Sequence, residues 1–286
     1  DPYSDFVQWW SGVSPTNDNK WQPGGVMAEA GPDGVVTLFI DIAQRSNLQL
    51  HVNAVDDVSF GPPVPMKIGE VKRAVRCVGV QLNDVIATYV SPDSYVYDSH
   101  SFVKVYVQEA DRSAGIAVLI DPFTMITPFP GDKLTVTGTL MFPDSEAILL
   151  AHSSAVVGYL PTPPAPLALN HRSLGGQTFN QPTLSNPGAC NVGLRMRLFG
   201  RITWPETGES GGVYIDDGSN LPTREPGAMG VRARLVYKNG VTFNKGDYIA
   251  VTGVLGIEQF TDSTGPYPAY VLLNGSPDDW DVLEAF

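Results

Sequence analysis

The hydrophobic residues of this chain fall into short stretches that alternate with polar residues or run apolar over a few positions. Stretches of this kind, rich in β-branched and aromatic side chains, are typical of β-strands. They occur at residues 35–42, 101–107, 134–138, 195–199, 231–235 and 248–251. Only residues 143–155 have a composition that favours a turn of helix. The pattern therefore predicts an all-β protein.

Two proline-rich stretches divide the chain, at residues 61–65 and 161–166. Clustered prolines stiffen a linker and are excluded from central strands. The 29 glycines and 24 prolines among the 286 residues also favour short strands joined by turns. We expect an N-terminal segment at 1–66, a second segment at 67–160, and a third at 161–286 that includes the second linker.

The second and third segments repeat one another. Residues 131–140 read GDKLTVTGTL, and residues 246–255 read GDYIAVTGVL. Further upstream, YVQE at 106–109 matches YIDD at 214–217. The order of strand, turn, strand, Gly-Asp turn and strand thus occurs twice, which indicates a duplicated small β domain.

This repeated pattern, which covers about residues 67–286, resembles the OB-fold modules of bacterial secreted proteins. In those modules a Gly-Asp-x-φ-x-Val-x-Gly stretch, with φ apolar, is a barrel strand. Gly138 and Gly253 occupy the second glycine of that stretch and suit the bend of a small closed barrel. The resemblance implies two tandem OB-fold-like small barrels.

The first segment resembles the C-terminal strands of a galactose-binding-like jelly roll. A similar closing strand is carried here by DDVSF at 56–60. A full sandwich needs roughly 100 residues, so we expect a partial β-sandwich with open edges and an uncovered apolar face. The large apolar side chains that need a covering surface, and are candidates for an assembly or glycan contact, are Trp9, Trp10, Trp21, Phe39 and Phe60.

The charge and composition favour a secreted protein. The 18 Lys and Arg against 30 Asp and Glu give a formal net charge of −12, which argues against holding duplex DNA mainly through phosphate contacts. No apolar run approaches the roughly 20 residues that cross a bilayer, so we expect no membrane span. The chain begins at Asp1 without a signal segment, and we expect one to have been removed. The expected location is extracellular or at the cell surface.

Cys77 and Cys190 are the two cysteines. In an oxidising compartment they form one disulfide between distant parts of the chain, and the alternative is two buried thiols. Metal-binding cysteine spacings are absent from the sequence. One sequon places a glycosylation site at Asn274.

The sequence offers little catalytic chemistry. The histidines at 51, 100, 152 and 171 are scattered, and nucleophile-elbow, HExxH and P-loop motifs are missing. The DDGSN stretch at 216–220 is oxygen-rich, but it lacks the ligand spacing of a calcium loop and fits an ordinary turn as well. We therefore expect no enzyme, no cofactor and no metal.

An OB fold often binds nucleic acid through aromatics and basic side chains on its second and third strands. Tyr106 and Tyr214 supply aromatics, and alternation places Arg195 with Arg197, and Arg232 with Arg234, on one strand face each. The other interpretation of these arginines is a solvated barrel face paired with Glu206, Asp216 and Asp217.

Together these patterns predict a secreted, non-enzymatic structural protein. Its open sandwich edge would be completed by a strand from a second copy, so that the chain assembles with itself into a fibre or surface layer. A carbohydrate- or cell-wall-binding accessory protein is the alternative. A single-stranded nucleic-acid-binding protein is the second alternative, although the acidity argues against nucleic acid as a partner.

Overall fold

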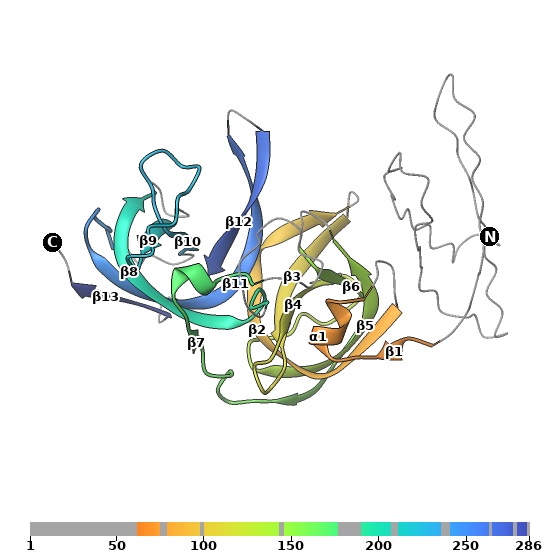
Figure 1. The fold of residues 1–286 in the computed structure, drawn as a ribbon. Coiled ribbons are helices and arrows are strands. Elements are labelled where there is room, and N and C mark those ends of the chain that lie inside the picture. The colour runs from red at the N-terminus through yellow and green to blue at the C-terminus, as the bar shows by residue number, and fades with distance from the viewer. Residues whose placement is uncertain are drawn as a thin grey trace, which may run out of the picture.

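The computed structural model describes residues 62–74, 79–97, 100–142, 146–176, 190–206, 211–235, 241–262, 265–276 and 279–284. Within these residues the chain is almost entirely β and forms two sheets, one after the other along the sequence (Figure 1). The predicted jelly-roll segment, with Trp9, Trp10, Trp21, Phe39 and Phe60, lies outside the described residues. No helix in the described part of the chain is long and apolar enough to cross a membrane.

The first sheet closes into a five-stranded barrel. Its strands pair in the order β2-β3-β4-β6-β5, and β5 pairs back onto β2. All neighbours are antiparallel except β4 and β6, which are parallel. The strands are β2 (Gly79–Tyr97), β3 (His100–Gln108), β4 (Gly115–Ile120), β5 (Asp132–Met141) and β6 (Ile148–Tyr159).

The second sheet has the same connectivity. Its strands pair in the order β8-β9-β10-β12-β11, β11 pairs back onto β8, and β10 and β12 are the parallel pair. These strands are β8 (Arg195–Pro205), β9 (Val213–Asp216), β10 (Val231–Arg234), β11 (Tyr248–Asp262) and β12 (Gly265–Leu273), and β13 (Trp280–Glu284) adds to β11. A five-stranded Greek-key barrel with this order is an OB-fold, so the predicted pair of tandem OB-like barrels is confirmed.

The duplication begins before each barrel. The short strand β1 (Val64–Pro65) runs parallel to β2, and the helix α1 (Ile68–Val71) follows it. In the same way β7 (Leu167–Ala168) runs parallel to β8 and is followed by the 3₁₀ helix η2 (His171–Ser173). The prolines around both short strands sit at sheet edges, where a missing N–H costs no ladder bond.

The helical turn predicted within residues 143–155 is wrong for the described part of that range. Residues 148–155 belong to β6, which pairs with both β4 and β5. Leu149 and Leu150 are buried on opposite sides of the strand, one in the first barrel core and one outside it. Burial on both faces gives a continuous apolar run that resembles a helix segment.

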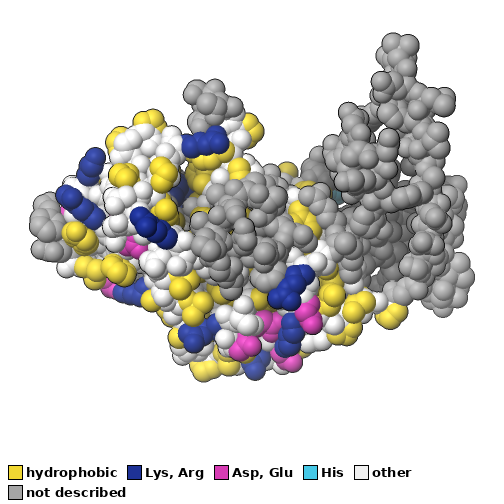
Figure 2. All heavy atoms as spheres, in the orientation of Figure 1, with side chains coloured by type: hydrophobic (Ala, Val, Ile, Leu, Met, Phe, Trp, Pro, Cys, Tyr) yellow, Lys and Arg dark blue, Asp and Glu magenta, His cyan; other side chains and the backbone are white. Residues whose placement is uncertain are grey.

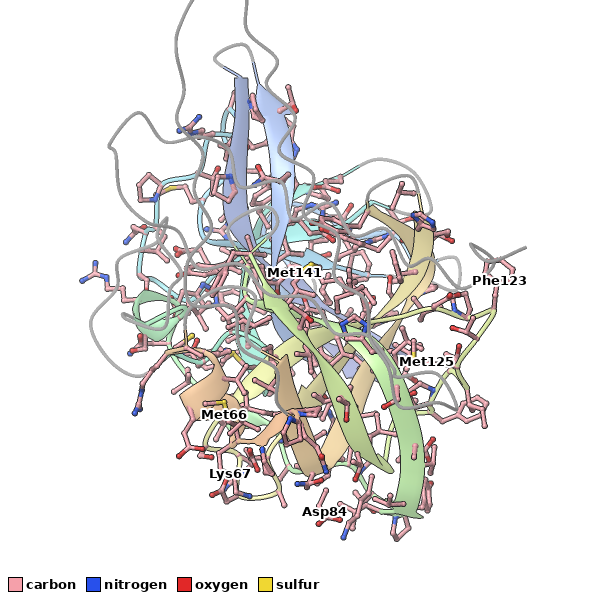
Figure 3. The ribbon with its side chains drawn as sticks, turned by 90° about the vertical axis from the view of Figure 1, so that its right-hand side faces the viewer. Met66, Lys67, Asp84, Phe123, Met125 and Met141 are labelled. Atoms are coloured by element: carbon pink, nitrogen blue, oxygen red, sulfur yellow. The ribbon has the colours of Figure 1, made fainter. Side chains whose placement is uncertain are left out.

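Each barrel encloses its own apolar core, built from alternate positions of its strands. Met66 and Met125 pack against the first core, whereas Phe123 is 88% exposed and points outward (Figure 3). The repeated glycines Gly138 and Gly253 lie where two strands approach closely. A Cβ at either position would come within 2.3–2.4 Å of a carbonyl oxygen of the neighbouring strand, so only glycine allows the barrel to close there.

A third apolar cluster joins the barrels. It contains outward-facing residues of the first barrel and three residues from β11 and β12 of the second, Val254, Val271 and Leu273. The contact includes backbone, since a Cβ on Gly115 would lie 2.2 Å from the carbonyl oxygen of Gly193. The Nζ of Lys72, after α1, also donates to the carbonyl of Val192 at 2.7 Å. The two barrels therefore share one packed interface.

Candidate nucleic-acid interface

Ligands of OB barrels bind on the outward face of the second and third strands and on the loops beside it. In the first barrel these strands are β3 and β4. Four of their outward residues are apolar or aromatic and lie in the cluster that joins the barrels: Phe102, Tyr106, Ala117 and Leu119. The outward Lys104 lines the pocket between the barrels, and the outward Gln108 accepts from the amide of Arg195. Tyr106 is fully buried, and the backbone of Gly256 in the second barrel lies against its hydroxyl. The prediction that Tyr106 offers an aromatic for bases is therefore wrong, because the second barrel covers it.

In the second barrel the equivalent strands are β9 and β10, and their outward face is polar. Val213, Ile215, Val231 and Ala233 point into the core. Alternation then turns Tyr214, Arg232 and Arg234 outward, and Arg232 lies opposite Tyr214 in the ladder. The sequence pattern predicted this placement of the arginine pair.

Carboxylates of neighbouring strands pair with both arginines. Arg232 binds Glu206 through two bonds of 2.5 and 2.7 Å, and Glu258 at 3.2 Å. Arg234 binds the other oxygen of Glu258 at 3.2 Å and also pairs with Asp93 of the first barrel. Burial alone would lower the pKa of Arg232, but the hydrogen bond and charge of Glu206 raise it above its ordinary value. Glu206 is thus the predicted partner, whereas Asp216 and Asp217 lie next to His171 instead.

Aromatic rings continue this face along the hairpin of β11 and β12. The rings of Phe260 and Tyr267 stack with centroids 5.8 Å apart and planes inclined by 30°. The guanidinium of Arg232 lies 5.3 Å from the centre of the Phe260 ring, and that of Arg224 lies 4.5 Å from the centre of the Tyr267 ring. We did not predict this hairpin from the sequence, where its signal is the mixture of apolar and aromatic residues after residue 254.

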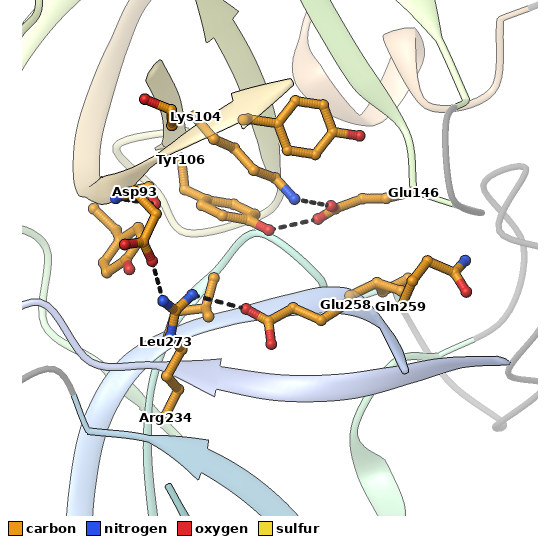
Figure 4. Close-up of a pocket in the computed structure, with 13 residues that line it drawn as sticks. Asp93, Lys104, Tyr106, Glu146, Arg234, Glu258, Gln259 and Leu273 are labelled. Carbon is orange, nitrogen blue, oxygen red and sulfur yellow. Dashed lines mark hydrogen bonds and ion pairs between the residues drawn. The ribbon is translucent and has the colours of Figure 1, made fainter. Parts of the chain in front are cut away.

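A pocket of about 240 Å³ lies between the barrels at the end of this face (Figure 4). On its first-barrel side the Nζ of Lys104 binds Glu146 at 2.5 Å, and the hydroxyl of Tyr106 donates to the same carboxylate at 2.8 Å. Arg234 and Glu258 form the opposite wall. The dashed lines in Figure 4 show that each charged group drawn there has an oppositely charged neighbour.

Arg195 and Arg197 lie on β8 rather than on this face. Arg195 pairs with Asp279 at 3.2 Å and Arg197 with Asp281 at 2.7 Å, both near β13. The structure therefore does not bring the two predicted arginine pairs together.

The other predicted sites have different outcomes. Cys190 is buried, with its Sγ 3.6 Å from Nζ of Lys72. Cys77 lies outside the described residues, so a disulfide between them stays a prediction.

Asn274 is fully buried and its amide donates to the carbonyl of Ser276 at 2.8 Å. A glycan on that nitrogen does not fit the folded chain, so this prediction is wrong.

No family model and no curated protein matches this chain. Among solved structures, the chain is similar to the p204 HINb domain, with 14% identity, 71% of this chain and 95% of that chain covered, and a TM-score of 0.29. It is also similar to a murine DNA-binding protein bound to double-stranded DNA, with 11% identity, 72% of this chain and 99% of that chain covered, and a TM-score of 0.31. A third similar structure is the single-stranded DNA-binding protein from Thermus aquaticus, with 11% identity, 73% of this chain and 93% of that chain covered, and a TM-score of 0.22. At these scores the likeness assigns neither a family nor a ligand.

The predicted self-assembling structural subunit is corrected. We expected a fibre or surface-layer subunit, but the solved structures to which the chain is similar include DNA-binding proteins. They do not support a glycan partner either. Two of these solved structures hold double-stranded DNA, against the expectation that nucleic acid is not a partner. The open sandwich edge on which strand complementation was based lies outside the described residues.

Proposed function

We propose that the protein binds single-stranded nucleic acid on the outward face of β9 and β10 and on the adjoining β11–β12 hairpin. One observation carries this proposal. Arg232, Phe260, Tyr267 and Arg224 form a continuous row on the ligand-binding face of an OB-like barrel, and Tyr214, which is 8% exposed, lies opposite Arg232 in the ladder. The equivalent face of the first barrel is buried, so the site belongs to the second barrel.

Stacking rather than charge supplies the affinity in this proposal. Bases stack on aromatic rings for about 1–3 kcal/mol each, with little regard to sequence. The arginines at the site already have carboxylate partners, so a phosphate has to displace a carboxylate to bind them. On the face shown in Figure 2, the Lys and Arg side chains are spread among hydrophobic and acidic ones. Single strands fit such a surface better than duplexes, whose bases are already stacked.

The chain has binding chemistry at this site and no proposed catalytic role. Its polar side chains are engaged with one another, and we keep the prediction that it is not an enzyme. Secretion also stays a prediction, drawn from composition.

Fluorescence anisotropy with a labelled oligothymidine and a matched duplex tests the proposal. We expect saturable binding of the single strand, weaker binding of the duplex, and a loss of about tenfold or more in affinity for Tyr267→Ala. Because at most three arginines, Arg224, Arg232 and Arg234, reach the strand, the slope of log K against log salt should be no steeper than about −2.1.

The matched control is Arg73→Ala, which removes an exposed arginine after α1 of the first barrel. It should bind as the parent chain does. Absence of saturable binding to single strands, or equal loss in the two variants, would overturn the proposal.

A further inference from the structure

A cluster of potential metal ligands lies at the end of β9, away from Arg232 and Arg234. It consists of His171 from the 3₁₀ helix η2, Asp216 at the end of β9, and Asp217 directly after the strand. One ligand atom from each residue lies within 4.8 Å of the others. The cluster connects the linker before the second barrel to the barrel itself.

His171 points to a ligand independently of the acidic pair. The residue is 1% exposed, and neither ring nitrogen has a hydrogen-bond partner. An unsatisfied buried polar group costs about 1–3 kcal/mol, so native proteins rarely leave one without a bound species. A nitrogen lone pair aimed at two carboxylates is what a cation requires.

The distances fit an ion better than a hydrogen bond. Nδ1 of His171 is 3.6 Å from Oδ1 of Asp217, which is too long for a hydrogen bond. Two ligands of a tetrahedral ion, each about 2.1 Å from it, are about 3.4 Å apart. The His171 and Asp217 atoms therefore already have about the required separation, and an Asp216 oxygen lies within 4.8 Å of both residues' ligand atoms.

Backbone amides hold the carboxylates in place. Asp217 accepts from the amides of His171 at 2.9 Å and Ser219 at 3.0 Å, and Asp216 accepts from the amide of Asn220 at 2.9 Å. Such bonds from outside the ligand set orient metal ligands and are part of built metal sites. Each of these carboxylates keeps lone pairs for a cation, because a carboxylate has about four acceptor positions.

We propose that His171, Asp216 and Asp217 bind one divalent transition-metal ion, with Zn²⁺ as the ion that best fits the set. An imidazole with two carboxylates suits Zn²⁺ and its neighbours, whereas Ca²⁺ and Mg²⁺ prefer oxygen ligands alone. Three protein ligands leave a fourth position for water. The ion ties η2 to the end of β9 and so fixes the linker on the second barrel. The sequence led us to expect no metal at the oxygen-rich stretch 216–220, and the buried His171 beside it is the observation that changes this expectation.

Isothermal titration of the full chain with ZnCl₂, under reducing conditions, tests this site. We expect one Zn²⁺ per chain and, at a hundredfold excess over Kd, a rise in Tm of about 5–10 °C. CaCl₂ should give neither effect. His171→Gln should abolish binding, and Asp216→Asn, at a partly exposed position, should weaken it about tenfold or more while the chain stays folded.

His100→Gln is the matched control, because His100 is exposed and lies on β3 of the first barrel. It should bind Zn²⁺ as the parent chain does. The ligand-field spectrum of a Co²⁺-loaded sample separates this site from the cysteines, since a thiolate ligand adds a charge-transfer band. Three results would overturn the proposal. They are an absence of saturable Zn²⁺ binding, binding by Asp216→Asn and His171→Gln that equals binding by the parent chain, and a thiolate band in the Co²⁺ spectrum.

Discussion

The two barrels have the same strand order, but the outward face of their second and third strands has different surroundings in each. In the first barrel the outward Phe102, Tyr106, Ala117 and Leu119 of the second and third strands lie in the apolar cluster shared with the second barrel. In the second barrel the equivalent strands present Tyr214, Arg232 and Arg234. In one copy this face therefore packs between the barrels, and in the other it carries arginines paired with carboxylates.

The carboxylates next to these two faces also differ in how deeply they are buried. Glu146 in the first barrel is buried, with 2% of its side chain exposed, and holds Lys104 and Tyr106 together. Glu258 in the second barrel is about a quarter exposed and shares its charge between Arg232 and Arg234. We expect the first to matter for stability and the second for binding.

The largest expected effect comes from Glu146→Ala. Removing one partner of a buried ion pair leaves the other uncompensated and costs about 3–5 kcal/mol. The free energy of unfolding, measured by urea denaturation, should fall by that amount, and affinity for oligothymidine should be unchanged in the folded fraction. A loss under 1 kcal/mol would show that the interface between the barrels does not depend on this pair.

A smaller effect is expected from the ionisation of Tyr89, which lies in the same interface. Burial raises the pKa of Tyr89 to about 12, whereas an unfolded tyrosine ionises near pH 10. A raised folded pKa means that the unfolded chain loses its proton first, so stability is present below pH 10 and is lost between pH 10 and 12. In Tyr89→Phe that loss should be smaller by about 2 kcal/mol, as measured by denaturation at several pH values. Identical profiles for the two chains would contradict the burial of this hydroxyl.

Glu258→Gln has the smallest expected effect in free energy, and it changes binding rather than folding. Neutralising this side chain leaves Arg232 with Glu206 and Arg234 with Asp93, so both arginines have more charge to offer a phosphate. Affinity for oligothymidine should rise about 3–10-fold, and the salt slope should steepen by about 0.7.

Asp84→Asn is the control for the change in net charge. Asp84 is exposed and its φ of 55° is one that asparagine tolerates. If both substitutions raise affinity equally, overall charge rather than the carboxylate at the site is responsible.

Much of the fold could be predicted from local pattern. Alternation identified strands such as 231–235 and their outward arginines, and the repeated GD-x-φ-x-V-T-G stretch identified the duplication. The same local rules failed at residues 148–155, where burial on both sides of β6 resembles a helix.

The site could be predicted only in part, because its partners come from distant strands. Which barrel face is covered depends on packing between Tyr106 and Gly256, which no local pattern records. The same holds for Asp93, which reaches Arg234 from the other barrel, and for His171, which lies 46 residues before Asp217.

The most direct test of the central claim is photocrosslinking of a bromodeoxyuridine-containing single strand to the full chain, with the crosslinked residues identified by mass spectrometry. We predict crosslinks on the outward face of the second barrel and its hairpin, at Phe260 or Tyr267, and none at the buried Tyr106. Crosslinks confined to the first barrel, or none at a concentration that saturates binding, would contradict it.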